Sequence, residues 1–430
     1  MMVAFHTLGC KVNQYETQAM RRLLEMAGYT TDEYSPGKTE PDVLVINSCT
    51  VTGESDRKLR QLLRRCRRQA PHAVLVLTGC MPQAYPEAAT ALTEADIVLG
   101  NAARRDILPR LEGYLAHRQR IVDIPPHDKH YEPLDIDAFQ GRTRAFVKIQ
   151  DGCNRFCSYC IIPYARGRVR SRHPEDLRQE LIRLAAQGYK EVVLVGINLT
   201  AYGQDCGLTI ADAVESACAV EGLERVRLGS LEPDFMTDEV IRRLAAQKKL
   251  CPQFHLALQS GCDTTLKRMN RHYDTAAYRD LCDRLRRQFP DCALTTDVMV
   301  GFPGETEEEF EQSRRFVEEI QFARVHVFAY SRRPGTVADR LPDQVNNADK
   351  NRRSRRMIET CRQAAEAYAE TYIGQTIPIL LETEYPDGTV DGHTDTYVTV
   401  RVNTHRTGGE MITAVITGRD GETLLGIEAP

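Results

Sequence analysis

The stretch that decides the architecture of this 430-residue chain is Asp151-Gly-Cys153-Asn-Arg-Phe-Cys157-Ser-Tyr159-Cys160. Its three cysteines, called the loop triad below, have the spacing C-x3-C-x2-C, with a tyrosine just before the last. Three thiolates this close in sequence bind three irons of a 4Fe–4S cube and leave the fourth iron without a protein ligand. A structural zinc ion would need a fourth ligand, and no second C-x2-C or histidine pair follows at zinc-finger spacing. The run therefore predicts an iron–sulfur site with one open iron.

An open iron chelates the amino and carboxylate groups of S-adenosylmethionine (SAM). An electron from the cluster then splits the sulfonium and releases a 5′-deoxyadenosyl radical. In these residues the chain resembles the radical-SAM superfamily. The resemblance implies SAM as a cofactor, with Tyr159 beside its adenine.

Composition sets the wider limits. The chain is 42% hydrophobic and long enough for two or three domains, and its net charge of −4 gives no global attraction to nucleic acid. We find no basic-then-apolar signal segment and no apolar run that would cross a bilayer. Fourteen cysteines in a chain of this length predict a reducing, cytoplasmic setting and no membrane association.

Residues 1–120 alternate between short β-branched runs and helical stretches, which predicts a flavodoxin-like domain with a parallel sheet. A linker rich in Pro, Asp and His is expected over 121–141. The expected strands are Val3–Leu8, Asp42–Asn47 and Ala73–Thr78, and the expected helices are Glu16–Ala27 and Ser55–Gln69.

Residues 142–370 repeat the alternation with six strand–helix units, too few for the usual eight-fold barrel. They suit an open, partial (βα)6 barrel of the radical-SAM kind. Residues 371–430 carry short strands and turn signals that predict a small β-barrel. The six expected strands are Ala145–Gln150, Glu191–Gly196, Arg225–Ser230, Gln253–Gln259, Leu294–Val300 and Arg324–Tyr330, and the expected helices include Pro174–Gln187, Thr306–Ile320 and Asn347–Tyr372.

A second set of cysteines, Cys10, Cys49 and Cys80, follows the first three expected strands and is called the sheet-edge triad below. The carboxyl ends of parallel strands meet at one edge of a sheet, where ligands bind. The three thiols should therefore converge and hold a second cluster, although three buried core cysteines would give the same pattern. The other eight cysteines, including Cys66 on the apolar stripe of its helix, are predicted to be structural.

Three further stretches make the resemblance specific: Gly9-Cys-Lys-Val-Asn-Gln-Tyr-Glu-Thr17, Ile46-Asn-Ser-Cys-Thr-Val-Thr52 and Leu228-Gly-Ser-Leu-Glu-Pro233. Together with the predicted domains they resemble the methylthiotransferases, in the branch that acts on threonylcarbamoyladenosine in tRNA. The other branches act on isopentenyladenosine in tRNA or on an aspartate of a ribosomal protein. A non-catalytic iron–sulfur or sulfur carrier would also keep both triads.

The family resemblance implies two 4Fe–4S clusters and two molecules of SAM per turnover. The cluster on Cys153, Cys157 and Cys160 would generate the radical that takes hydrogen from C2 of the modified adenine, next to the anticodon. The cluster on Cys10, Cys49 and Cys80 would hold the sulfur that a first SAM methylates. The expected partners are tRNA carrying threonylcarbamoyladenosine, an electron donor such as flavodoxin or ferredoxin, and a sulfur source. A monomer is expected.

The remaining SAM contacts are expected at the ends of the barrel strands, where ligands bind in such folds. The alternative is that these side chains cap helices or satisfy loop backbones. The candidates are Gly196, Asn198, Ser230, Glu232, Gln259, Ser260 and Asp297.

Three basic runs are candidates for phosphate contacts: Arg57–Arg68, Arg166–Arg172 and Lys350–Arg356. The plain alternative is a solvated charged face. The terminal barrel resembles the RNA-binding TRAM domain. However, residues 373–430 hold three Arg, no Lys and nine Asp or Glu, so any phosphate surface there must be local, around Arg401, His405 and Arg406.

Overall fold

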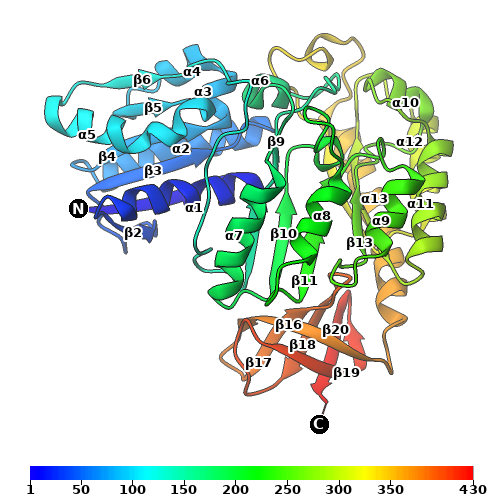
Figure 1. Cartoon of the computed structure of the whole chain (residues 1–430). Coiled ribbons are helices and arrows are strands. Elements are labelled where there is room, and N and C mark those ends of the chain that lie inside the picture. The colour runs from blue at the N-terminus through cyan, green and yellow to red at the C-terminus, as the bar shows by residue number, and fades with distance from the viewer. Residues whose placement is uncertain (430) are drawn as a thin grey trace. The chain divides into compact units, whose positions relative to one another are not determined.

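The computed structural model describes residues 1–429 and divides into two compact units. Unit 1 comprises Met1–Gln140, Phe146–Arg172 and Ser331–Asp339, and unit 2 comprises Gly141–Ala145, His173–Tyr330 and the chain from Arg340 onwards. Parallel sheets flanked by helices and a closed barrel near the C-terminus confirm the predicted mixed α/β class (Figure 1). No helix within residues 1–429 is long and apolar enough to cross a membrane.

Unit 1 is built on a six-stranded, all-parallel sheet with the order β2-β1-β3-β4-β5-β6. The three predicted strands are confirmed to within one residue at each end as β1 (Met2–Thr7), β3 (Val43–Ser48) and β4 (Val74–Gly79). Sequence reasoning missed three short strands, whose runs of three or four residues are too brief for a clear pattern: β2 (Thr30–Glu33), β5 (Ile97–Leu99) and β6 (Ile121–Asp123).

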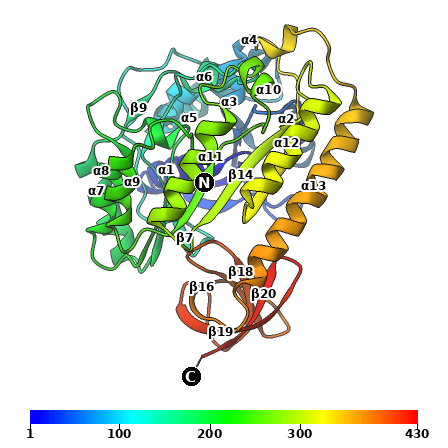
Figure 2. The ribbon, with the colours of Figure 1, turned by 90° about the vertical axis from the view of Figure 1, so that its right-hand side faces the viewer.

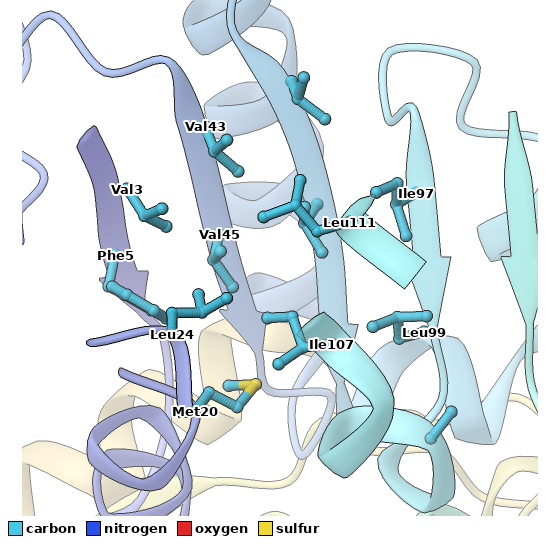
Figure 3. Packing of buried hydrophobic residues seen from close by; sticks show 13 residues of the cluster. Val3, Phe5, Met20, Leu24, Val43, Val45, Ile97, Leu99, Ile107 and Leu111 are labelled. Atoms are coloured by element: carbon cyan, nitrogen blue, oxygen red, sulfur yellow. The ribbon is translucent and has the colours of Figure 1, made fainter. Parts of the chain in front are cut away.

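Both faces of this sheet are buried, which explains why β3 and β4 are almost continuously apolar. On one face, Met20 and Leu24 of α1 (Lys11–Met26) and Ile107 and Leu111 of α5 (Ile107–His117) pack against alternate strand residues (Figure 3). On the other face, α2 (Gly53–Gln69) contributes Leu59, Leu63 and Cys66.

Local sequence fixes where these helices start. α1 begins five residues earlier than predicted, because Cys10 has extended backbone (φ −83°, ψ 177°) and leads directly into the helix. α2 begins after Thr52, whose side chain accepts a hydrogen bond from the Ser55 N–H, with acidic residues in the first turn. Each helix start lies close to a cysteine of the sheet-edge triad.

The rest of unit 1 is made of short elements around the loop triad. β8 (Gln150–Asp151) and β9 (Arg170–Ser171) pair antiparallel and close the base of the loop that carries Cys153, Cys157 and Cys160. The segment 124–140 has no helix or strand, yet it buries Leu134, Ile136 and Phe139. The other elements are α3 (Cys80–Ala84), α4 (Pro86–Thr90), η1 (Asn101–Asp106), β7 (Arg144–Lys148, which begins in unit 2), α6 (Ile162–Arg166) and η3 (Ala338–Arg340, which ends in unit 2).

Unit 2 contains the predicted strand–helix series, in two sheets of order β11-β10-β7 and β12-β13-β14-β15. The pairs within unit 2 are parallel, as the alternation required. Its strands are β10 (Glu191–Val195), β11 (Arg225–Leu228), β12 (Ser230–Leu231), β13 (Gln253–Leu256), β14 (Ala293–Val300) and β15 (Arg324–Ala329). Its helices are α7 (Pro174–Ala186), η2 (Leu199–Ala201), α8 (Ile210–Cys218), α9 (Asp238–Ala245), α10 (Asp263–Arg268), α11 (Thr275–Gln288) and α12 (Glu307–Ile320).

The last helix, α13 (Asn347–Glu370), runs to the closed barrel in Figure 2. The barrel has the order β16-β17-β18-β20-β19 and its own apolar core, to which Ala369 and Tyr372 contribute. Its strands are β16 (Thr376–Glu384), β17 (Thr389–His393), β18 (Thr399–Asn403), β19 (Met411–Asp420) and β20 (Thr423–Glu428).

Gly79 provides a test of how the fold places Cys80. Its φ of 105° lies in a region that side chains rarely adopt, and a Cβ there would lie 2.4 Å from the Ser48 carbonyl oxygen. We expect Gly79→Ala to lower the free energy of unfolding by about 3 kcal/mol or more, from backbone strain plus a clash with backbone. Urea denaturation followed by circular dichroism measures this.

The matched control is Gly28→Ala, because Gly28 also has positive φ (88°) but open space around the added Cβ. Strain alone should cost it about 1–2 kcal/mol. Equal losses for the two variants would contradict the close approach at Gly79.

Candidate iron–sulfur sites

The sheet-edge triad comes together as expected from the topology. Cys10 follows β1 and precedes α1, Cys49 follows β3, and Cys80 is the first residue of α3 after β4. The loops approach so closely that a Cβ added to Gly9 would lie 3.0 Å from the Cys49 Cβ. The Cys10 thiol donates a hydrogen bond to the Asn13 Oδ1 at 3.2 Å.

The thiols of this triad also affect one another's pKa values. Loss of hydration raises the pKa of Cys10, and the charge of Cys80 raises it further. Burial and then the charge of Cys80 raise the pKa of Cys49 to about 12. Three thiolates could not coexist here without compensating positive charge, which iron would supply.

Three thiols and two buried hydrogen-bond donors are available at this sheet edge to hold an iron–sulfur cube. Within residues 1–429, no group of three or more His, Cys, Asp or Glu side chains is arranged to hold one metal ion. In a 4Fe–4S cube each thiolate binds a different iron, so the thiols stand further apart than around one ion. Two buried polar atoms near the triad have no hydrogen-bond partner in the described chain. They are the Oγ1 of Thr78, two residues before Cys80, and the Nε of Arg166 on α6, which packs against α3. Such donors suit the sulfides of a cluster.

The loop triad lies on a tightly held loop of the same unit, and all three of its cysteines are partly exposed. The Cys153 N–H donates to the Gly167 carbonyl at 3.0 Å. Gly152 has φ 76°, and any Cβ there would lie 1.8 Å from the Arg168 carbonyl oxygen. The backbone at Gly152 therefore passes very close to the backbone at Arg168, which fixes the loop that carries these three partly exposed thiols. Such a loop could bind a cluster with one iron open to a small ligand.

A buried charge network joins the surroundings of the two triads. The Glu16 carboxylate, fully buried on α1, binds Arg104, Arg166 and Lys148, the last at 3.1 Å. Asp151, two residues before Cys153, binds Lys148 at 3.3 Å and Arg166 at 3.5 Å. Burial by itself would raise the pKa of Glu16, but the three cations lower it to about 2. This network was not foreseen, because charged residues on a helix normally face solvent.

A second unforeseen feature is a strap of residues 331–339 that belongs to unit 1. The buried Arg333 donates to the Thr50 Oγ1 at 2.7 Å and pairs with Asp56 at 2.6 Å, beside Cys49. The Ala338 N–H donates to the Ser158 carbonyl at 2.7 Å, beside Cys157. The strap therefore fixes one loop of each triad. Arg333 is about 280 residues away from Thr50 and Asp56, so the sequence does not indicate that it contacts them.

The predicted SAM contacts divide between the units. Tyr159 lies in unit 1 beside the loop triad, and the others lie in unit 2. Gln259 has φ 66° and a buried Oε1 without a hydrogen-bond partner in the described chain, and its backbone N–H donates to the Asp297 carbonyl at 2.9 Å. Glu232 binds Arg271, so it has a structural role in any case. No contact tests the set, which stays a prediction: Tyr159, Gly196, Asn198, Ser230, Glu232, Gln259, Ser260 and Asp297.

Two of the three basic runs are only partly exposed, so they offer less phosphate-binding surface than predicted. Arg166, Arg170 and Arg172 are buried in unit 1. Lys350 and Arg353 are also buried, and Arg352 and Arg356 pair with glutamates of α12. The buried arginines of these segments hold the protein together, because a buried guanidinium requires carboxylate or carbonyl partners. Arg168 and Arg355 are exposed, and a phosphate contact there stays a prediction.

The α2 run is confirmed as exposed except at Arg67, which binds Asp96 at 2.6 Å and the carbonyl oxygens of Glu94 and Ala73. In the terminal barrel, Arg401 pairs with Asp391 at 2.8 Å and Arg406 with Glu410 at 3.3 Å, which weakens a local basic surface. Among the eight other cysteines, Cys206 is exposed, so its predicted core role is wrong; the other seven are buried.

Comparison with known proteins first defines the class. Residues 147–317 match the Radical SAM superfamily, and residues 2–100 match a family described only as uncharacterized protein family UPF0004. Two solved structures share the fold at low identity. The radical S-adenosylmethionine methyltransferase TsrM from Kitasatospora setae has a TM-score of 0.58 and 14% identity, over 79% of this chain and 74% of that chain. The radical enzyme OxsB has a TM-score of 0.53 and 12% identity, over 84% and 56%.

Sequence relatives narrow the class. The threonylcarbamoyladenosine tRNA methylthiotransferase MtaB of Bacillus subtilis is 43% identical over 93% of this chain and 89% of its own length. MtaB of Thermotoga maritima is 36% identical over 92% and 90%. A tRNA-2-methylthio-N(6)-dimethylallyladenosine synthase of Clostridium botulinum is 36% identical over 87% and 85%. The chain belongs to the MtaB family of radical-SAM tRNA methylthiotransferases, which confirms the resemblance drawn from the motifs.

Glu16→Gln tests the buried network in the apoprotein. This substitution removes the negative charge that Arg104, Lys148 and Arg166 share. We therefore expect the free energy of unfolding at pH 7 to fall by about 3–5 kcal/mol. The folded-state pKa of Glu16, about 2, lies below its usual value of 4.5. Its contribution is therefore complete above pH 4.5 and is lost as pH falls towards 2.

Urea titrations of both proteins from pH 7 to pH 3 measure this difference, which should shrink below pH 4.5. Glu25→Gln, at an exposed position of the same helix, is the control and should stay within about 0.5 kcal/mol of the wild type. A difference that does not vary with pH would show that Glu16 is not the titrating centre.

Proposed function

We propose that this protein attaches a methylthio group to C2 of N6-threonylcarbamoyladenosine next to the anticodon of tRNA. The observation that carries the proposal is the convergence of a second cysteine triad at the sheet edge of unit 1, in a chain of this family. A radical-SAM protein that only generated a radical would need the loop triad alone. The second triad supplies a place for sulfur.

Each cysteine triad would hold one cluster, and the two clusters would have different roles. Cys153, Cys157 and Cys160 would hold the cluster that binds SAM, and Cys10, Cys49 and Cys80 would hold the cluster that carries sulfur. When bound, the two clusters and two molecules of SAM per turnover supply radical abstraction of hydrogen and a methylthio group. The protein's own part is to orient the ligands: Tyr159 beside the adenine of SAM, and Asn198, Ser230, Gln259, Ser260 and Asp297 at the strand ends of unit 2.

The partners follow from the chemistry. Radical generation needs one electron from a donor of the flavodoxin or ferredoxin type, and each product consumes one sulfur atom that a sulfur source must replace. The protein would act as a monomer in the cytoplasm.

A second substrate deserves the same test, because a relative named as a dimethylallyladenosine synthase is 36% identical to this chain. Mass spectrometry of nucleosides in tRNA from cells with and without the gene separates the two. We expect loss of the methylthio form of threonylcarbamoyladenosine alone. Loss of the methylthio form of dimethylallyladenosine instead would show that the protein acts on dimethylallyladenosine and not on threonylcarbamoyladenosine. No change in tRNA would favour the ribosomal-protein substrate or a sulfur carrier.

The two triads should bind separate clusters. Changing Cys153, Cys157 and Cys160 together to Ala should leave about half of the reconstituted iron and abolish SAM cleavage. Changing Cys10, Cys49 and Cys80 to Ala should also leave about half, but 5′-deoxyadenosine should still form while the methylthio product is lost. Iron determination and chromatography of the products measure both.

Cys206→Ala is the control for these variants, because Cys206 is an exposed cysteine outside both triads and should keep all of the iron. Complete loss of iron from either triple variant, in a folded protein, would contradict independent sites.

The surface proposed to meet tRNA is a groove on α2. It encloses about 480 Å³ and is lined by Gly53, Arg57, Arg60, Gln61 and Arg64. Arg57 pairs with the exposed Glu54 on the same helix, and Arg64 lies 3.4 Å from Glu94. Exposed pairs such as Arg57–Glu54 are weak. Phosphates could therefore replace that carboxylate.

Replacing Arg57, Arg60 and Arg64 by Gln should weaken tRNA binding at low salt. Each lost phosphate contact reduces the log–log salt slope by roughly 0.7–0.9, so the slope should fall by about 2–3 in total. Filter binding at several salt concentrations measures it. Arg65→Gln with Arg68→Gln, exposed positions of the same helix outside the groove, should change the slope less. An unaltered slope in the groove variant would leave α2 a solvated face.

A further inference from the structure

Arg166 belongs to the buried charge network around Glu16, but one of its buried nitrogens has no partner in that network. Arg166 ends α6, six residues after Cys160, and is among the largest fully buried side chains. α6 packs against α3, the short helix that begins with Cys80. A residue of the loop-triad segment is thus brought to the sheet-edge triad.

The two terminal nitrogens of the Arg166 guanidinium have hydrogen-bond partners, but its Nε has none within residues 1–429. Its two terminal nitrogens bind the Glu16 carboxylate, with Nη2 to Oε2 at 2.9 Å, and Nη1 also lies 3.5 Å from the Asp151 Oδ1. Its Nε is buried and has no hydrogen-bond partner in the described chain. A buried N–H normally has an acceptor, so this nitrogen is available to donate to a ligand atom.

The charge of Arg166 acts on the sheet-edge triad. The pKa of Arg166 is lowered by burial, but the charges of Cys80, Glu16 and Asp151 raise it well above its usual value, with Cys80 first among them. Arg166 also opposes the raised pKa values of Cys10 and Cys49. Because α6 packs against α3, which begins with Cys80, this guanidinium lies near the sheet-edge triad, and a positive charge beside a cluster favours its more negative, reduced form.

We propose that Arg166 is a positioning residue for the cluster on Cys10, Cys49 and Cys80, that its Nε–H donates to a sulfur held there, and that its charge raises the reduction potential of this cluster. The inference deepens the proposed function and rests on it, because it requires that the sheet-edge triad bind a cluster. Glu16 and Asp151 hold the guanidinium in place, and Asp151 leads directly into the loop triad.

The test measures the reduction potential of the sheet-edge cluster alone, in full-length protein in which Cys153, Cys157 and Cys160 are replaced by Ala. Arg166→Gln in this background should lower the ratio of reduced to oxidised cluster at fixed potential at least tenfold, a shift of 59 mV for one electron. Arg166→Lys, which keeps the charge, should recover at least half of the shift. Redox titration followed by electron paramagnetic resonance gives both values.

Arg104→Gln is the matched control. Arg104 is equally buried and also binds Glu16 and Asp151, but no thiol is among the main charges acting on it. Its replacement should move the potential by less than a third of the Arg166→Gln shift. Equal shifts for Arg166→Gln and Arg104→Gln, or an unchanged potential in Arg166→Gln, would overturn the assignment.

Iron content covers the case in which Arg166→Gln fails to hold the cluster. Iron lost from Arg166→Gln but kept in Arg166→Lys and Arg104→Gln would support the assignment, and iron lost from all three would overturn it. A background protein that binds no iron at all would instead refute the second cluster, and with it both the proposed function of the triad and the role of Arg166.

Discussion

The buried carboxylate of Glu16 is the interaction on which the rest of unit 1 depends. One helix turn and a half beyond Cys10, it binds Arg104, Arg166 and Lys148, three cations from three separate segments. Removing any partner of such a group leaves charge buried without compensation, which is far more costly than losing a surface pair. Because Asp151 shares these cations, the loop that follows it is held by the same charges.

This arrangement relates the two triads to the fold. Strand ends of a parallel sheet supply Cys10, Cys49 and Cys80, and a tightly crossed loop supplies the other three cysteines. Burial without metal raises the pKa of Cys10 and Cys49, so the apoprotein keeps these two thiols protonated and metal binding would release their protons. The strap around Arg333 adds a second connection between the same two loops.

Much of this was predictable from the sequence. Apolar runs predicted β1, β3 and β4 and the later strands β7, β10, β11, β13, β14 and β15, and cysteines placed just after strands predicted their own convergence. The two-residue strand β12 was not separated from β11. Buried charge was not predictable. Arg166 and Lys350 were predicted as surface cations, because one sequence does not show that the Glu16 carboxylate lies beside Arg166, or the Tyr330 carbonyl beside Lys350, after folding. Arg67 was misjudged for the same reason, since its carbonyl partners are distant in sequence.

On this proposal one chain holds two clusters, of which one binds SAM and the other carries sulfur. Mössbauer spectroscopy of protein reconstituted with 57Fe, before and after addition of SAM, tests it most directly. We expect about eight irons per chain, in two cubes of four, with the signal of about one iron changed by SAM. About four irons per chain, or a spectrum that SAM leaves unchanged, would contradict it.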